Sequence, residues 1–247
     1  MKKVFYIFLF LTQFTWAQDA FEKGNTLYQR EQYQEAVSTY EAILKSGQES
    51  AEVYFNLGNC YYKLNQVAPA VYNFEKALAL QPNDSEIQNN LAFAKKMAID
   101  EIQETPIVGF SKIIQDFTSR FHYDTWAWMA IVLAVSFLLS FLGYYFSSTT
   151  TLKRVFFLGM VTLLLLVVIS VFAGFFEQNR IQNDKPAIVF AEVIAVKSEP
   201  KAASQDAFTL HAGTKVQIIE TISNYHKIQL ADLKEGWIEK SAVKELK

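Results

Sequence analysis

YFNLGNCYYKL, residues 54–64, decides the fold of the N-terminal part of this chain. The stretch holds four aromatic residues, one glycine and the only cysteine of the 247-residue sequence. Four of its residues have identical counterparts 34 positions upstream: Phe21, Gly24, Asn25 and Tyr28 match Phe55, Gly58, Asn59 and Tyr62. A fixed period of this length is typical of repeat architectures, in which each repeat is one supersecondary unit.

The period and its residues resemble the tetratricopeptide repeat, a 34-residue helical hairpin. In the second copy eight residues occupy the signature positions: Tyr54, Leu57, Gly58, Tyr61, Ala70, Phe74, Ala77 and Pro82. The first copy agrees at fewer positions: Ala20, Gly24, Leu27, Ala36 and Tyr40. One hairpin cannot bury its apolar face alone, so copies stack and a terminal helix covers the end. We therefore predict a repeat domain over residues 18–104, with about two repeats and a closing helix that begins near Ser85.

Cys60 corresponds to Thr26 in the first copy, so this position takes a small side chain where two helices approach each other. Cysteine packs in such places as a small apolar residue. The alternative is a redox or catalytic thiol, which would need a lowered thiol pKa. We expect packing.

In tetratricopeptide repeats the first helix of each hairpin lines a concave groove that binds extended peptides. The resemblance carries this expectation to seven residues: Asn25, Tyr28, Asn56, Asn59, Tyr62, Lys63 and Asn90. Asparagine amides can both donate to and accept from a peptide backbone. The alternative is that these asparagines lie on an exposed helix face and contact only solvent. Residues 18–104 carry 7 basic and 13 acidic residues, hence a net charge of −6, which favours a basic or neutral peptide.

Residues 1–17 have the anatomy of a secretory signal peptide. Two lysines precede an apolar run over residues 4–11, and the small residues Thr15 and Ala17 follow it. The run is too short to cross a bilayer, which needs about 20 apolar residues in a helix. A cleaved signal is therefore our expectation, and an uncleaved anchor is the alternative.

Residues 105–124 are predicted to form an amphipathic helix. Pro106 suits its first turn, and apolar residues recur at steps of three and four: Ile107, Phe110, Ile114, Phe117 and Phe121. Lys112, Asp116 and Arg120 fall on the polar side. Because a membrane span follows, we expect this helix to lie at the bilayer surface, and a cap on the repeat domain is the alternative.

Two transmembrane helices are predicted, at residues 125–147 and 155–176, because both segments lack charge and reach the length that crosses a bilayer. The loop at residues 148–154 contains Lys153 and Arg154, and the positive-inside rule places it in the cytoplasm. Both flanking domains then lie outside, in agreement with a signal peptide. We predict a protein of the bacterial inner membrane with periplasmic N- and C-terminal domains.

After a linker at residues 177–186, the pattern changes to an alternation with β-branched residues. Candidate strands are residues 188–196, 214–222, 225–230 and 236–239. The succession LHAGTKV, YHKIQL and GWI resembles the bacterial Src-homology-3 barrel, so we expect a small all-β barrel over residues 187–247. Such barrels bind peptides or cell-wall fragments through aromatic residues, and the candidates are Phe208, Tyr225 and Trp237. Core and rim packing is the alternative role.

The sequence offers no set of residues that would support catalysis. His122, His211 and His226 lie on different predicted elements and lack metal-ligand spacing. No phosphate-binding glycine loop, nucleophile elbow or zinc-binding H-E-x-x-H motif occurs. Residues 177–247 carry ten basic and ten acidic residues, which does not favour nucleic acid. We therefore predict no enzyme activity, no metal and no cofactor.

The order of these parts resembles the BatE family of the Bacteroidetes aerotolerance (Bat) system. That resemblance implies von Willebrand factor A-domain membrane proteins and a MoxR-type ATPase as partners in an envelope or oxidative-stress task. The first hypothesis for function is an inner-membrane scaffold that presents two peptide-binding modules to the periplasm. The second is a cell-wall sensor whose barrel binds peptidoglycan. The third is a redox enzyme that uses Cys60.

Overall fold

The computed structural model of the chain describes residues 19–102 and 109–246. Two units are present: the N-terminal helices together with the C-terminal sheet form one, and residues 105–184 contain the other. Each unit is described by itself. The predicted signal peptide at residues 1–17 lies outside the described residues.

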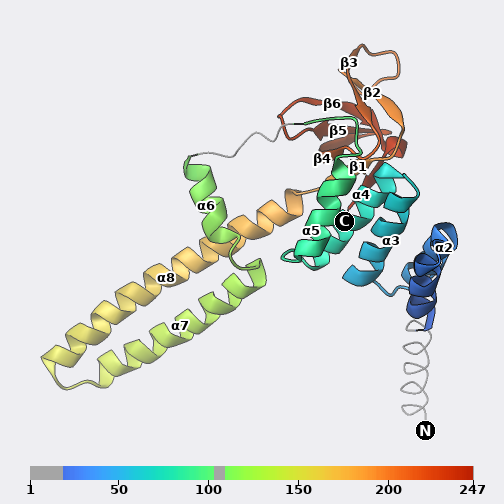
Figure 1. Cartoon of the computed structure of the whole chain (residues 1–247). Coiled ribbons are helices and arrows are strands. Elements are labelled where there is room, and N and C mark those ends of the chain that lie inside the picture. Colours follow the sequence, from blue (N-terminus) through green and yellow to red (C-terminus); the bar gives the residue numbers. More distant parts are fainter. Residues whose placement is uncertain (1–18, 103–108, 247) are drawn as a thin grey trace, which may run out of the picture. The chain divides into compact units, whose positions relative to one another are not determined.

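Helical hairpins form where the 34-residue period predicts them. Helical residues 19–29 pair with α2 (Tyr33–Lys45), α3 (Ala51–Lys63) pairs with α4 (Val67–Leu80), and α5 (Ser85–Lys95) follows (Figure 1). The predicted N-cap of the closing helix is present, since the Asp84 carboxylate accepts hydrogen bonds from the backbone of Glu86 and Ile87. A side-chain acceptor at this position satisfies backbone groups that the helix itself leaves unpaired.

The two hairpins share the same backbone turn. Glu31 and Asn65, 34 residues apart, both adopt the left-handed conformation, with φ of 61° and 58°. After each of them, the next backbone N–H bonds back to the helix: Gln32 to the Leu27 carbonyl, and Gln66 to the Tyr61 carbonyl. This is the Schellman pattern that ends a helix. The period therefore extends to the backbone conformation of the turns.

Glycine lets the two helices of each hairpin approach closely. A Cβ at Gly58 would lie 2.7 Å from the Phe74 ring, and one at Gly24 would lie 2.5 Å from the Tyr40 ring. Both rings are fully buried. The small residue and the ring that fills the space beside it thus occur in both copies.

The C-terminal part forms a seven-stranded antiparallel sheet in the order β3-β2-β6-β5-β4-β1-β7. The strands are β1 (Pro186–Val189), β2 (Val193–Lys197), β3 (Asp206–His211), β4 (Lys215–Ile222), β5 (Tyr225–Gln229), β6 (Glu235–Glu239) and β7 (Val243–Glu245). The single strand predicted over residues 188–196 is wrong, because the chain leaves the sheet after Val189 and re-enters at Val193. Strands β3 and β7 were not predicted, since both are short and β7 spans three residues. Whether this sheet is a Src-homology-3-like barrel stays a prediction.

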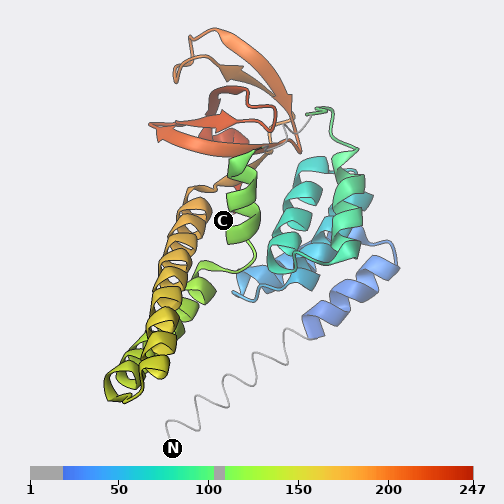
Figure 2. The same cartoon turned by 90° about the vertical axis from the view of Figure 1, so that its left-hand side faces the viewer.

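The sheet and the repeats share an apolar core. Ile188 and Leu246 of the sheet are buried together with Ala68, Val71 and Phe74 of α4. Strand β1 contacts α4 directly, and the two views show the sheet against one end of the repeat helices (Figure 2). Because a stack of hairpins needs its last apolar face covered, the sheet supplies part of that cover in addition to α5.

Three helices make up the second unit: α6 (Phe110–Thr118), α7 (Tyr123–Phe146) and α8 (Thr150–Asn183). By length and composition, α7 and α8 could each cross a membrane. They run side by side as a hairpin (Figure 1). A Cβ at Gly143 would lie 2.6 Å from the Phe156 ring, so a glycine again permits a close helix contact.

Three boundaries differ from the sequence prediction. Helix α8 continues to Asn183, through most of the predicted linker at 177–186, because neither glycine nor proline occurs before Pro186 and Glu177 pairs with Arg180 one turn on. At its other end α8 begins at Thr150, so Lys153 and Arg154 belong to the helix and not to the loop.

The predicted helix over residues 105–124 is shorter. Helix α6 ends at Thr118, and α7 begins only at Tyr123. Ile107 lies outside the described residues, and Ile114 is half-buried, whereas Ile113 is 65% exposed. The exposed apolar side chains of this segment are therefore Phe110, Ile113, Phe117 and Phe121.

Candidate partner-binding groove

The predicted groove residues include two pairs of asparagines that bond to each other across neighbouring helices. Asn56 Nδ2 donates to Asn25 Oδ1 at 2.9 Å. The Tyr40 hydroxyl donates to the same Asn25 oxygen at 2.7 Å and accepts from Asn56 Nδ2 at 3.3 Å. Asn25 and Asn56 are both half-buried. The first pair thus joins the first helix of one repeat to the first helix of the next.

The second pair repeats this arrangement 34 residues further on. Asn90 Nδ2 donates to Asn59 Oδ1 at 2.9 Å, which connects α5 with α3. In both pairs the partners are 31 residues apart. This spacing is a sequence signal that could have predicted the pairing, because a pair separated by 31 residues and repeated at 34 places the same contact between successive first helices.

Each pair keeps one donor group and one acceptor group for a ligand. Within the described residues the hydrogen bonds use the oxygens of Asn25 and Asn59 and the nitrogens of Asn56 and Asn90. The nitrogens of Asn25 and Asn59 and the oxygens of Asn56 and Asn90 remain. An extended peptide backbone alternates donors and acceptors and can bond to both kinds of group.

Tyr28, Tyr62 and Lys63 complete the predicted set. Tyr28 is half-buried, and its ring packs edge-on against Tyr33 with centroids 5.3 Å apart. Burial raises the pKa of the Tyr28 hydroxyl above its ordinary value, with a smaller contribution from Cys60, so it is a neutral donor at physiological pH. Tyr62 is half-buried and Lys63 is exposed.

Phe93 extends this surface, and the sequence analysis missed it. Phe93 lies three residues after Asn90, as Tyr62 lies three residues after Asn59, so each ring is one helical turn beyond its asparagine. The side chain is 54% exposed, and Lys96 Nζ lies 5.4 Å from its ring centroid. The structure therefore adds an exposed aromatic residue beside the second asparagine pair.

Cys60 lies in the apolar core of the first hairpin and the start of the second. It is fully buried with Val37, Tyr40 and Leu57 as neighbours in the same cluster. Burial raises the pKa of the Cys60 thiol to about 12. A thiol becomes a nucleophile only as the thiolate, so this environment favours packing over redox chemistry.

The aromatic candidates of the sheet do not form one surface. Phe208 packs against the sheet core, and it would lie 3.6 Å from a Cβ at Gly236. Trp237 follows Gly236 on β6 and therefore points to the opposite face. In the strand register Trp237 lies between Lys197 of β2 and Lys227 of β5.

Tyr225 shares the face of Trp237. It stands two residues before Lys227 on β5, and side chains two apart on a strand point the same way. The two lysines beside Trp237 are already paired, Lys197 with Asp206 and Lys227 with Glu235. Tyr225 and Trp237 thus remain a candidate pair, and Phe208 lies apart from them.

Two carboxylates of the repeat domain bind the sheet. Glu75 of α4 is 7% exposed, and its oxygens lie 2.7 Å from Lys215 Nζ and 3.0 Å from Lys95 Nζ. Burial alone would raise the pKa of Glu75, but the two lysines outweigh burial and hold it below its ordinary value. This carboxylate therefore stays ionised and links α4, α5 and β4.

Asp100 holds the turn between β3 and β4. Its carboxylate accepts hydrogen bonds from the His211 backbone at 2.7 Å and the Thr214 hydroxyl at 2.6 Å, and His211 Nδ1 lies 2.7 Å from its other oxygen. Burial opposes ionisation, but these hydrogen bonds hold the pKa of Asp100 below its ordinary value. The Thr214 hydroxyl donates to the aspartate and not to the histidine, so the three groups cap a turn and do not form a nucleophilic triad.

Groups of side chains that could hold a metal ion are absent from residues 19–102 and 109–246. His211 lies at the turn just described, whereas His226 is buried in β5 and lies 2.8 Å from the Thr221 hydroxyl. His122 precedes α7 and pairs with Asp124. The three histidines therefore have separate surroundings.

Two comparisons with known families identify the repeats. Residues 24–65 match a family model described as "TPR repeat", and residues 51–84 match one described as "Tetratricopeptide repeat". A comparison with curated proteins found no match. The matched segments contain both asparagine pairs except Asn90. The chain therefore carries tetratricopeptide repeats, modules through which proteins bind other proteins.

Proposed function

We propose that this protein is a membrane-anchored scaffold that binds partner proteins through the groove of its repeats. The observation that carries the proposal is the duplicated asparagine pair. Asn25 with Asn56 and Asn59 with Asn90 each offer a donor and an acceptor at repeat spacing, as an extended peptide requires. The net charge of −6 over residues 18–104 favours a neutral or basic segment.

The anchor in this proposal is the α7–α8 hairpin, inserted in the bacterial inner membrane. Its length and composition support insertion. The positive charges of Lys153 and Arg154 at the closed end of the hairpin support a cytoplasmic position for that end. The repeats and the sheet would then both face the periplasm.

The physiological setting is proposed on resemblance alone. The order of the parts is similar to the BatE family, which suggests von Willebrand factor A-domain proteins and a MoxR-type ATPase system as partners in an aerotolerance or envelope-stress complex. The wall-binding alternative has less support, because Phe208 faces away from Trp237 and the lysines beside Trp237 are paired.

Site-specific photo-crosslinking in intact cells tests the scaffold. A photoreactive amino acid at Tyr62 reports on the groove, and the same amino acid at Gln34, exposed on α2, is the control. We expect partner adducts at Tyr62 that are absent at Gln34 and that weaken when Asn59→Ala removes one amide. Identical adducts at both positions, or none at Tyr62, would contradict the proposal.

A further inference from the structure

The three-helix unit has polar groups inside and apolar groups outside. Thr118, Ser170 and Glu177 are 1%, 4% and 3% exposed. On the outer face of α6, by contrast, Phe110 is 75% exposed and Ile113 is 65% exposed. A soluble bundle has the opposite arrangement, because water solvates polar groups and apolar side chains are buried. Polar groups that face the interior are the rule for helices in lipid.

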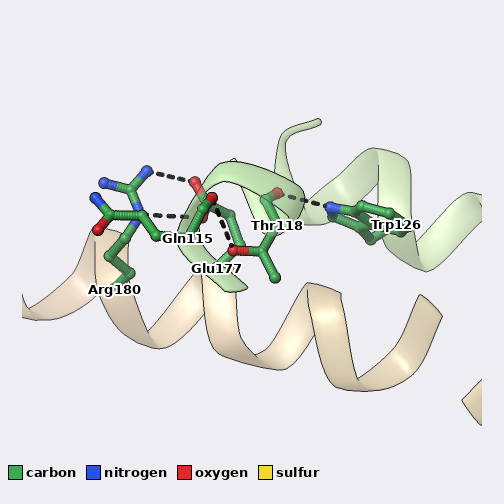
Figure 3. A network of polar contacts seen from close by, with 5 residues as sticks. All are labelled: Gln115, Thr118, Trp126, Glu177 and Arg180. Atoms are coloured by element: carbon green, nitrogen blue, oxygen red, sulfur yellow. Dashed lines mark hydrogen bonds and ion pairs between the residues drawn. The ribbon is translucent and has the colours of Figure 1, made fainter. Parts of the chain in front are cut away.

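Helix α6 is held against the ends of α7 and α8 by its polar side. Trp126 Nε1 of α7 donates to the Thr118 carbonyl at 2.9 Å. Figure 3 shows Gln115 and Thr118 of α6 lying over α8 beside Glu177 and Arg180, where Arg180 Nε donates to Glu177 at 2.9 Å. The side of α6 that faces α8 is therefore settled by contacts, and the other side faces outward.

The apolar side of α6 is continuous with the base of the hairpin. The Trp126 ring lies 5.3 Å from Phe117 and 5.4 Å from Phe121, centroid to centroid. A Cβ at Gly174 of α8 would lie 3.2 Å from Trp126 Cβ, so the same tryptophan also packs against α8. Aromatic rings thus connect α6 to both long helices.

The level of α6 along the hairpin follows from the sequence of the long helices. The uncharged part of α8 ends at Phe176, directly before Glu177, and that of α7 starts after Asp124. Tryptophan, here Trp126, prefers the boundary between hydrocarbon and water. Helix α6 is therefore attached where both apolar segments end.

We propose that Phe110, Ile113, Phe117 and Phe121 form a lipid-binding stripe that lies among the headgroups of the leaflet where α7 begins and α8 ends. The proposal rests on the proposed membrane insertion of the hairpin. The occupant is lipid because the stripe continues the apolar outer surface of the long helices. The exposed cations Lys112 and Arg120 beside it suit lipid phosphates.

Single-site fluorescence of the full-length protein in vesicles tests the stripe. In a Cys60→Ala background, an environment-sensitive dye is attached to Ile113→Cys, to Asp116→Cys on the exposed polar side of α6, and to Leu165→Cys in the middle of α8. The vesicles contain phospholipids brominated either near the headgroup or near the chain end. Bromine quenches only a dye that touches the lipid.

The dye at position 113 should emit at shorter wavelength than the dye at position 116 and should lose fluorescence with bromine near the headgroup. The dye at position 165 should be quenched by bromine near the chain end. If position 165 is quenched and position 113 is in water, the stripe is wrong and the anchor stands. A short-wavelength dye at position 113 without quenching means that protein covers the stripe, which also overturns the proposal. No quenching at position 165 would contradict the proposed anchor itself.

Discussion

At the scale of single residues, the repeat depends on how closely its helices approach. Gly58→Ala would place a methyl group 2.7 Å from the Phe74 ring, and that ring is fully buried and has no free space to move into. We expect a loss of about 1–3 kcal/mol in the free energy of unfolding, the usual cost of overpacking. Denaturant titration of the purified protein measures it. Gly159→Ala is the matched control, because no atom lies within 4 Å of its added Cβ.

The left-handed turn residues offer a prediction of the opposite sign. Glu31 adopts φ of 61° although its side chain disfavours this region, whereas the equivalent Asn65 tolerates it. Glu31→Gly should raise the free energy of unfolding by about 0.5–1 kcal/mol, because glycine ends helices in this conformation without a steric penalty. Asn65→Gly should change it less. An equal gain at both positions would show that strain at Glu31 is not the cause.

At the scale of elements, the closing helix α5 depends on its N-cap. Asp84→Ala leaves the backbone N–H groups of Glu86 and Ile87 without their acceptor. We expect a loss of about 1 kcal/mol in the free energy of unfolding. Asp84→Asn should keep most of the stability, since its amide oxygen can accept the same bonds. Thermal unfolding of the variants compares them, and equal losses for alanine and asparagine would exclude capping as the reason.

At the scale of the whole molecule, two carboxylates link the repeats to the sheet. The pKa values of Glu75 and Asp100 are both lowered in the folded protein, so each favours folding most when ionised. Their contribution is complete above the unfolded pKa of about 4 and is lost as the pH falls below it. We expect the free energy of unfolding to decrease between about pH 5 and pH 3.

Glu75→Gln tests this link. The substitution removes the charge between Lys95 and Lys215 and should cost about 1–2 kcal/mol at neutral pH, a value reduced by the partial exposure of both lysines. It should also flatten the decrease below pH 5. Glu192→Gln, in an exposed part of the sheet domain, is the control. An unchanged pH profile in Glu75→Gln would show that the carboxylate is not a link.

A buried histidine adds a second, milder region of pH dependence. Burial lowers the pKa of His226 in the folded protein, more than the nearby Glu245 raises it. Folding is therefore favoured by neutral His226 above the unfolded pKa of about 6.5, and the contribution is lost as the pH falls below that value. His226→Gln should remove the dependence of the thermal midpoint between about pH 6.5 and pH 5. A retained slope would assign it to another group.

The sequence by itself determined the parts whose signals are local. The 34-residue period predicted both hairpins, the packing of Cys60 and the N-cap at Asp84, since these depend on residues within one repeat. The uncharged runs predicted the two long apolar helices. Their ends were missed, because glutamate, glutamine and asparagine after Phe176 are read as linker but continue a helix when no proline or glycine intervenes.

Only the tertiary structure decided the contacts between distant segments. Asp100 meets His211 and Glu75 meets Lys215 across more than a hundred residues, and no local pattern encodes such pairs. The same holds for the direction of α6, where Ile113 and not Ile114 is exposed because Thr118 bonds to Trp126. Periodicity specifies which side chains can share a face, but the partner that covers that face depends on how the chain packs in space.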